Sequence, residues 1–263
     1  MPDESPEVEE LLLDLKSGKP LAAMLAPSFP VIFDYPQIVG KLKRLGFKYI
    51  VEVACGAQET NNQLLSLLKQ NPKRKYITSP CSNIVRLIRE KYTHLVKYLA
   101  QTDSPMSATV KIVKKKYPGF RPVFIGPCPI KKLEAKEDWP ELNILVLTYR
   151  EIIEVFDKMG IKDDASDKQA DFDLQHSLTR LYPISGGLSE SSYFNRLLTD
   201  EEYDVISGPK MVEQSLNEFP RNRLRVLDIL ACDGGCINNI SIPTTLVLSQ
   251  RRQKVIDYWN RRL

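Results

Sequence analysis

The fold of this chain is limited most strongly by an alternation of short apolar runs with helix-length amphipathic stretches. The runs are rich in Val, Ile and Leu, have the length of buried strands and occupy residues 21–25, 49–54, 76–79, 123–126, 144–148 and 226–230. Between them apolar residues recur three and four positions apart, as in residues 84–99. This order predicts an α/β fold with mainly parallel strands and flanking helices.

The length and composition set the size of the core. With 263 residues and 43% hydrophobic content, the chain can form one large domain or two lobes that share a cleft. The polar stretch 163–171 is the expected hinge, which predicts lobes of residues 1–162 and 163–263. No apolar run approaches the roughly 18 residues of a membrane span, and the acidic residues 3–10 are unlike a signal peptide. We therefore expect a cytoplasmic protein without a membrane span.

The charge of the chain is nearly balanced. Its 37 basic and 33 acidic residues give a formal net charge of +4, so charge gives no reason to expect a nucleic-acid partner. Basic residues do gather in residues 251–263, where Val255, Ile256 and Trp259 recur at helical spacing. We expect a terminal helix packed on the body with a solvated basic face, in preference to a docking surface for an acidic partner.

The five cysteines require a separate explanation. They are too few for a disulfide scaffold, and thiols in the cytoplasm stay reduced. Because the chain has only two histidines, a metal site would depend mainly on thiolate. Thiolate ligands point to zinc or to an iron–sulfur cluster.

Four of the cysteines follow the ends of expected strands. Cys81, Cys128 and Cys232 each come just after an apolar run, and Cys236 shares the loop of Cys232. In an open α/β sheet the crevice beyond the carboxyl ends of the strands is the usual place for a ligand. The prolines and glycines beside these cysteines allow tight loops with backbone amides close to the sulfurs. The four thiols are therefore predicted to share one metal site.

Other interpretations of these residues remain open from spacing alone. The four cysteines also suit small buried side chains, or a closed zinc site. Zinc sites usually pair their cysteines in two short knuckles, whereas Cys81 and Cys128 stand alone, which favours iron–sulfur. Cys55 also ends an apolar run, but a buried free thiol is the simpler expectation. His94 and His176 are expected to be structural or solvated.

Three segments contain the four cysteines: TSPC at 78–81, GPCPIKKLEA at 126–135 and LACDGGCIN at 230–238. Together and in this order, they resemble the signature loops of the catalytic domain of iron-only (FeFe) hydrogenases. Similar short segments at 25–29, 43–49, 104–106 and 185–187 extend the resemblance over nearly the whole chain, which is most similar to the divergent sensory branch. The resemblance implies two α/β lobes with a cluster in the cleft between them.

The resemblance also implies roles for particular residues. Cys81, Cys128, Cys232 and Cys236 would bind a 4Fe-4S cluster, and Cys236 would also bridge to the two-iron subsite of the H-cluster. Lys131 matches the lysine that contacts a cyanide of that subsite, and a charged donor suits an anionic ligand. No ferredoxin-type cysteine cluster is present near the N-terminus. A redox partner, such as a ferredoxin or a cluster-bearing subunit, is therefore expected.

The departures from the family concern proton transfer. Pro80 stands where the family has a proton-donating cysteine, and proline has no proton to titrate. Gln63, Leu64 and Ala100 occupy the part of the sequence where the family has acidic residues and a serine. Further departures near the two-iron subsite are Gly126, Leu230, Asp233, Asn239 and Ile240. The proton path is therefore expected to be lost.

Three functions follow as hypotheses. The first is a hydrogenase-like iron–sulfur protein with low or no H2 turnover, acting in redox sensing, in electron transfer or as a complex subunit. The second is a minimal active FeFe hydrogenase that interconverts protons and H2. The third is a zinc-bound or metal-free interaction module, because fold alone does not establish activity.

Overall fold

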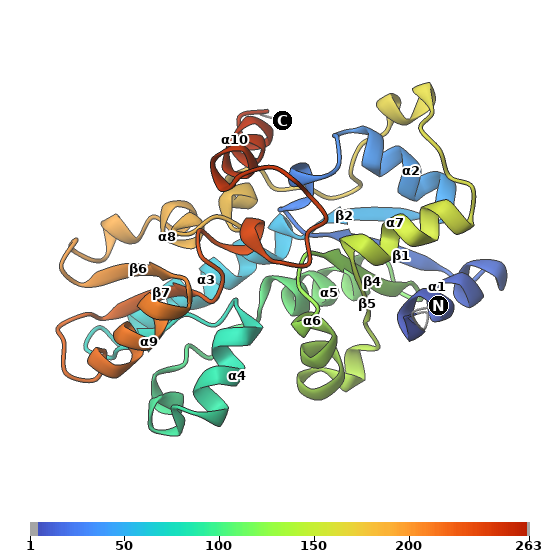
Figure 1. Cartoon of the computed structure of the whole chain (residues 1–263). Helices are drawn as coiled ribbons and strands as arrows, with labels where there is room; N and C mark the ends of the chain where they lie inside the picture. Colours follow the sequence, from blue (N-terminus) through green and yellow to red (C-terminus); the bar gives the residue numbers. More distant parts are fainter. Residues whose placement is uncertain (1–4, 262–263) are drawn as a thin grey trace.

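Two parallel β-sheets flanked by helices form the protein in the computed structural model, which describes residues 5–261 (Figure 1). The first sheet has the strand order β2 (Tyr49–Glu52), β1 (Leu21–Leu25), β4 (Arg121–Gly126) and β5 (Leu145–Thr148). The second has the order β3 (Tyr76–Ile77), β7 (Val226–Leu230) and β6 (Tyr203–Ser207). All of these pairings are parallel, so the predicted α/β class is confirmed.

The helices connect the strands and cover the sheets. They are α1 (Pro6–Lys16), α2 (Gln37–Leu45), α3 (Ala54–Gln70), α4 (Ser82–Glu90), α5 (Pro105–Lys116), α6 (Ile130–Leu133), α7 (Tyr149–Lys158), α8 (Gly187–Ser192), α9 (Pro209–Glu218) and α10 (Leu248–Trp259). A π-helix, Glu134–Asp138, directly extends α6. Local signals fix several of these boundaries: Thr148 and Glu151 form a capping box at the start of α7, and Ser104 caps α5 before Pro105.

Each sheet has its own apolar core. The first sheet is covered on both sides, and every residue of β1 is buried, as expected for a central parallel strand. The second sheet packs α4 and α9 against one face and α3 and α8 against the other. Because α3 starts at the end of β2 and packs beside β3, it connects the two sheets.

The predicted elements agree with the structure at most positions. Strands β1 and β7 have the predicted bounds, and the others differ at their ends. The prediction missed β6, a short strand at the edge of the second sheet whose Asp204 is exposed. The helical pattern of 84–99 is divided after α4, because Thr93–Tyr98 forms a separate 3-10 helix. The predicted terminal helix is α10, which buries Val255 and Tyr258; residues 262–263 lie outside the described part.

The second sheet contains strands from both sides of the expected boundary at residue 162. β3 precedes this boundary and pairs with β7, which follows it. Lobes of residues 1–162 and 163–263 stay a prediction, and such lobes would share a sheet. Within the expected hinge, Asp167 is buried and forms an ion pair with Arg44 of α2 at 2.7 Å. The stretch is therefore attached to the first sheet's helices.

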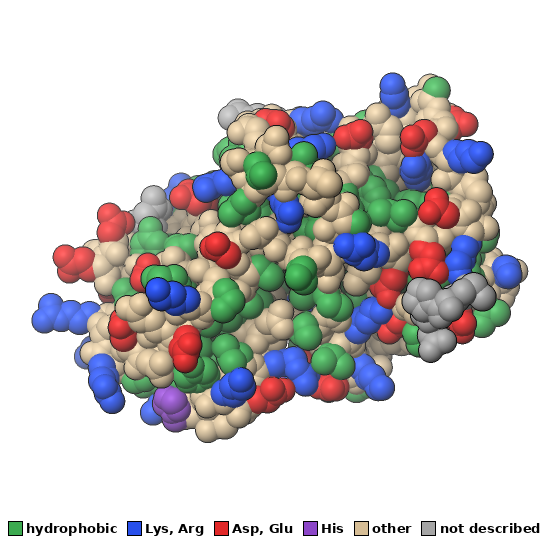
Figure 2. Space-filling model, in the orientation of Figure 1, with side chains coloured by type: hydrophobic (Ala, Val, Ile, Leu, Met, Phe, Trp, Pro, Cys, Tyr) green, Lys and Arg blue, Asp and Glu red, His purple; other side chains and the backbone are tan. Residues whose placement is uncertain are grey.

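The surface mixes both signs of charge. On the face shown in Figure 2, basic and acidic side chains are interspersed, and hydrophobic side chains gather near the centre. This mixture agrees with the small net charge of the sequence. Among the helices of residues 5–261, none combines the length and the apolar character that crossing a membrane requires.

Candidate metal centre

A small cavity lies between the carboxyl ends of the two sheets. Its volume is about 80 Å³, and we call it the central cavity. The residues that line it are Ala26, Pro27, Ser28, Val53, Pro80, Pro105, Met106, Phe124, Pro127, Cys128, Lys131, Tyr182, Pro183, Leu188, Asp228, Leu230 and Cys236. Most of this lining is apolar, and two charged side chains, Lys131 and Asp228, belong to it. The crevice therefore lies where parallel sheets usually bind ligands.

The four cysteines of the prediction act on one another electrostatically. Burial raises the pKa of Cys236 well above its usual value, and the charges of Cys81, Cys128 and Cys232 raise it further. Burial likewise raises the pKa of Cys232 to about 11, with further contributions from Cys81 and Cys128. Geometry supports this grouping for two of the loops, because Cys128 and Cys236 line the same cavity.

Amide groups donate hydrogen bonds to the sulfurs. Asn239 Nδ2 lies 3.7 Å from Cys232 Sγ, and Asn83 Nδ2 lies 3.9 Å from Cys128 Sγ. The backbone N–H of Ile130 also lowers the pKa of Cys128, which burial raises. Such N–H donors stabilise negative charge on sulfur and are a regular feature around iron–sulfur clusters.

The loop between Cys232 and Cys236 requires its two glycines. Gly234 and Gly235 have φ angles of 73° and 105°, which favour glycine. A Cβ on Gly235 would lie 2.4 Å from the carbonyl oxygen of Pro183, so any side chain there would collide with backbone. The glycines therefore allow the loop to turn tightly and to bring Cys236 to the cavity.

The donor set fits a cluster by its chemistry. Within residues 5–261, no three His, Cys, Asp or Glu side chains come together in a way that could hold one metal ion. A cubane cluster makes a different demand, because each of its irons takes a single thiolate ligand. Cys128 and Cys236 line one cavity, and Cys81 and Cys232 belong to loops that adjoin it, with amide donors at Cys128 and Cys232. This set of thiols has the composition that such a cluster needs.

The two adjacent lysines of the second signature loop lie in different environments. Lys131 lines the central cavity, where its Nζ donates to the carbonyl oxygen of Pro80 at 3.3 Å and pairs with Glu134. Lys132 instead pairs with Glu7 at 2.7 Å and with Glu151. Only Lys131 is therefore placed to act on a group inside the cavity.

Asp228 is a residue of the cavity that the sequence analysis missed. It lies in β7, is completely buried, and accepts hydrogen bonds from the hydroxyl and the backbone N–H of Ser189 at 2.8 and 3.2 Å. Burial raises its pKa to about 6, although these hydrogen bonds oppose the rise. The available signal was an acidic residue inside an apolar strand, because such a residue needs a structural or chemical reason.

The remaining cysteine and the histidines lie elsewhere. Burial, and then the charge of Glu52, raise the pKa of Cys55 to about 12. His94 is exposed. His176 is half-buried, with Nδ1 3.1 Å from the Thr179 hydroxyl, and burial lowers its pKa. These placements agree with structural or solvated roles for all three.

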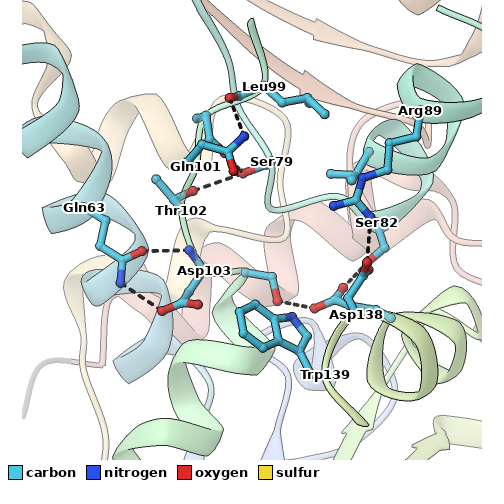
Figure 3. A pocket seen from close by; sticks show the side chains of 14 residues that line it. Gln63, Ser79, Ser82, Arg89, Leu99, Gln101, Thr102, Asp103, Asp138 and Trp139 are labelled. Carbon is cyan, nitrogen blue, oxygen red and sulfur yellow. Dashed lines mark hydrogen bonds and ion pairs between the residues drawn. The ribbon is translucent and has the colours of Figure 1, made fainter. Parts of the chain in front are cut away.

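A second, larger depression lies beside the central cavity. This polar groove has a volume of about 580 Å³ and is lined by Gln63, Ser79, Ser82, Val85, Arg89, Leu99, Ala100, Gln101, Thr102, Asp103, Ser104, Glu134, Asp138 and Trp139. Gln63 and Asp103 face each other on one side of it, with Arg89 and Asp138 on the other (Figure 3). Gln63 accepts from the backbone N–H of Asp103 at 2.7 Å. Two positions of the expected lost proton path, Gln63 and Ala100, therefore line this groove.

This chain is similar to a family of hydrogenase domains and to a protein of iron–sulfur cluster assembly. The family described as iron only hydrogenase large subunit, C-terminal domain, matches residues 19–239. The cytosolic Fe-S cluster assembly factor NAR1 of Eremothecium gossypii is 29% identical over 121 residues. That alignment covers 44% of this chain and 27% of the relative, so the chain matches about a quarter of the relative's length.

Hydrogenases are among the solved structures that resemble this chain in shape. FeFe-hydrogenase HydA1 from Chlamydomonas reinhardtii superposes with a TM-score of 0.71 at 19% identity, covering 95% of this chain and 88% of the other. An apo form of the same algal enzyme gives a TM-score of 0.72 at 18% identity with the same coverage. At such low identity the likeness shows a shared fold.

Proposed function

Because the chain belongs to the family of the iron-only hydrogenase large subunit, C-terminal domain, we propose that it is a hydrogenase-like iron–sulfur protein that turns over H2 slowly or not at all. Its cofactor is one 4Fe-4S cluster held by Cys81, Cys128, Cys232 and Cys236. When bound, the cluster supplies one-electron transfer. The protein works in the cytoplasm in redox sensing, in electron transfer or as a subunit of a complex.

One observation carries this proposal: Cys128 and Cys236, from loops that follow β4 and β7, line the same cavity between the sheets, and the charges of Cys81 and Cys232 act on Cys236. Burial raises the pKa values of Cys128, Cys232 and Cys236, so these thiols are costly to ionise without a metal. Iron removes that cost by taking the negative charge of the thiolates. The amides of Asn83 and Asn239 add the donors that ligated sulfur accepts.

The proposal of weak H2 turnover rests on the residues beside the cavity. H2 formation needs protons delivered to the metal site, and a titratable side chain within hydrogen-bond reach usually does this. Pro80 lines the cavity at the position of the family's proton donor and cannot transfer a proton. Gln63 presents an amide, and Ala100 an inert methyl group, along the former path. Lys131 would lie beside a two-iron subsite if one were bound at Cys236.

A second candidate role is suggested by the similar yeast protein. That relative is a cytosolic Fe-S cluster assembly factor, and its alignment covers nearly half of this chain. A chain that binds a cluster without H2 chemistry could serve cluster assembly through a redox partner, such as a ferredoxin or a cluster-bearing subunit. Capture of a cluster-bearing protein by this chain, lost in the Cys236→Ala variant, would favour this role.

Anaerobic purification tests the cofactor. The proposal expects a brown protein with broad visible absorption, four irons per chain after reconstitution and an electron paramagnetic resonance signal on reduction. The matched control is Cys55→Ala, which should retain the iron and the signal. A colourless protein that binds zinc and no iron after reconstitution would contradict the proposal and support the interaction module.

A second experiment tests the activity. After loading with a synthetic two-iron complex, the protein is expected to show H2 turnover far below that of active hydrogenases. Infrared bands of metal-bound carbonyl and cyanide report whether the two-iron group was inserted, so low activity is interpreted only when the bands are present. Turnover within a few-fold of an active hydrogenase would establish the minimal active enzyme instead.

A further inference from the structure

Glu134 is a buried carboxylate that stands between the central cavity and the polar groove. It is 5% exposed and lines the groove, whereas its partner Lys131 lines the cavity. It is the first residue of the π-helix that extends α6. Insertions of this kind in helices are frequent at functional sites.

The carboxylate of Glu134 gathers donors from three elements. It accepts hydrogen bonds from the hydroxyls of Ser82 and Ser104 and from the Lys131 ammonium. Ser82 begins α4 beside the second sheet, Ser104 caps α5, and Lys131 lies on α6. Because a buried charge requires such donors, Glu134 links the helices of both sheets at the edge of the cavity.

Lys131 is fixed by this contact. The spacing of three residues places Lys131 and Glu134 on the same side of the helix. The same ammonium donates to the carbonyl oxygen of Pro80, in the loop that carries Cys81. Only 12% of the Lys131 side chain is exposed, so its charge acts mainly inside the protein.

Both charges lie close to the cavity that Cys128 lines. Lys131 lines it together with Cys128, and Glu134 pairs with Lys131. In the interior, charges interact more strongly than in water. A change in either residue should therefore change the electrostatic potential at any group that the cysteines hold.

We propose that Glu134 is a positioning residue that holds the Lys131 ammonium at the wall of the central cavity and offsets its charge, and thereby sets the reduction potential of the bound cluster. This inference rests on the proposed function, because the potential exists only if a cluster is bound. Reduction adds negative charge to a cluster, so an uncompensated cation beside it favours the reduced form.

The test compares the midpoint potentials of three reconstituted variants. Glu134→Gln keeps an acceptor for the two serine hydroxyls but leaves Lys131 uncompensated, so its potential should become more positive. Lys131→Met leaves the carboxylate uncompensated, so its potential should become more negative. The double variant removes both charges and should return towards the parent. Glu134→Asp, which keeps the charge, should remain closer to the parent than Glu134→Gln.

A nearby carboxylate provides the matched control. Asp138 lies in the same π-helix and pairs with Arg89 at 2.6 Å. Both of these residues line the polar groove. Asp138→Asn removes the same charge but should shift the potential less than Glu134→Gln. The inference is overturned if both single variants shift the potential in the same direction, or if Glu134→Gln leaves it unchanged.

A measurement on the metal-free protein separates this inference from the proposed function. Acylation of lysine amines, followed by mass spectrometry, should modify Lys131 several-fold faster in Glu134→Gln than in the parent. Lys132, which pairs with Glu7 and Glu151, should react equally in both. An unchanged rate at Lys131 shows that Glu134 does not hold it. A parent protein that binds no cluster defeats the proposed function, while acylation still decides whether Glu134 positions Lys131.

Discussion

Two regions of this protein place a thiol just beyond the end of a parallel strand. In the first, Cys55 follows β2 beside Glu52, which forms what we call the Glu52 network with Arg180, Tyr258 and His176. In the second, Cys128 and Cys236 line the central cavity, and Cys81 and Cys232 lie in the loops that follow β3 and β7. The Glu52 network is internally complete: Arg180 Nε and the Tyr258 hydroxyl each lie 2.9 Å from the carboxylate, and the His176 N–H lies at 3.2 Å.

Within residues 5–261, the thiols at the cavity have no comparable set of partners. Their contacts are weak N–H donors, and the ammonium of Lys131 is offset by Glu134. Position after a strand therefore does not define a site by itself. A site arises where several such residues meet and lack internal partners, because the remaining cost of burial can then be removed by a ligand.

The largest difference is expected from removing a thiol in each region. Cys236→Ala should lose nearly all of the iron and lower the melting temperature of the reconstituted protein, because cluster binding contributes to folding. Cys55→Ala should retain the iron. Iron analysis and thermal unfolding check this prediction. Equal iron loss in the two variants would remove the distinction between the regions.

The next effect concerns the Glu52 network. Arg180 is 1% exposed, and Arg180→Met leaves the Glu52 carboxylate buried without its cation. We expect a loss of about 3–5 kcal/mol in the free energy of unfolding, measured with urea. Lys254→Met, which removes an exposed contact to Asp34, should cost about 0–1 kcal/mol. The iron bound per folded Arg180→Met molecule should be unchanged.

Asp228 is buried like Glu52, but the cation Arg180 pairs with Glu52. The stability of the folded protein should therefore depend on pH through Asp228. Its pKa is raised from 3.8 to about 6, so the folded protein favours the protonated form. Stability that is present below pH 3.8 is lost as the pH rises through about 6. In the metal-free protein, Asp228→Asn keeps an acceptor for Ser189, and it should raise stability at pH 7 by about 2–3 kcal/mol.

Urea unfolding at several pH values tests this expectation, with the exposed Asp257→Asn as control. The Asp228→Asn variant should show a flatter pH dependence between 3.8 and about 6 than the parent, whereas the control should follow the parent. If the Asp228→Asn variant kept the pH dependence of the parent, this would show that the pKa of Asp228 is not raised in the folded protein.

The smallest effect is expected at the edge of the Glu52 network. Tyr258→Phe removes the hydroxyl that donates to Glu52 but keeps the ring, whose centroid lies 4.8 Å from that of Phe29. The free energy of unfolding should fall by about 1 kcal/mol. A loss as large as that of Arg180→Met would show that the hydroxyl, and not the guanidinium, is the main partner of Glu52.

Much of the fold could be predicted because local patterns carry it. The apolar runs predicted the bounds of β1 and β7, since a buried parallel strand is apolar along nearly its whole length, with Asp228 of β7 as the exception. β6 was missed because it lies at an edge and keeps Asp204 exposed, so it lacks that pattern. The membership of β3 in the second sheet was also hidden, because a two-residue strand does not specify its partner.

The sequence by itself determined that the strands are parallel and that the cysteines of the candidate site follow three of them, because apolar periodicity and residue order are local properties. Only the tertiary structure decided which charges surround those cysteines. Glu134 meets Ser82 and Ser104, and Asp228 meets Ser189, across separations of 30 or more residues. Such contacts depend on the packing of helices on two sheets, which no local pattern encodes.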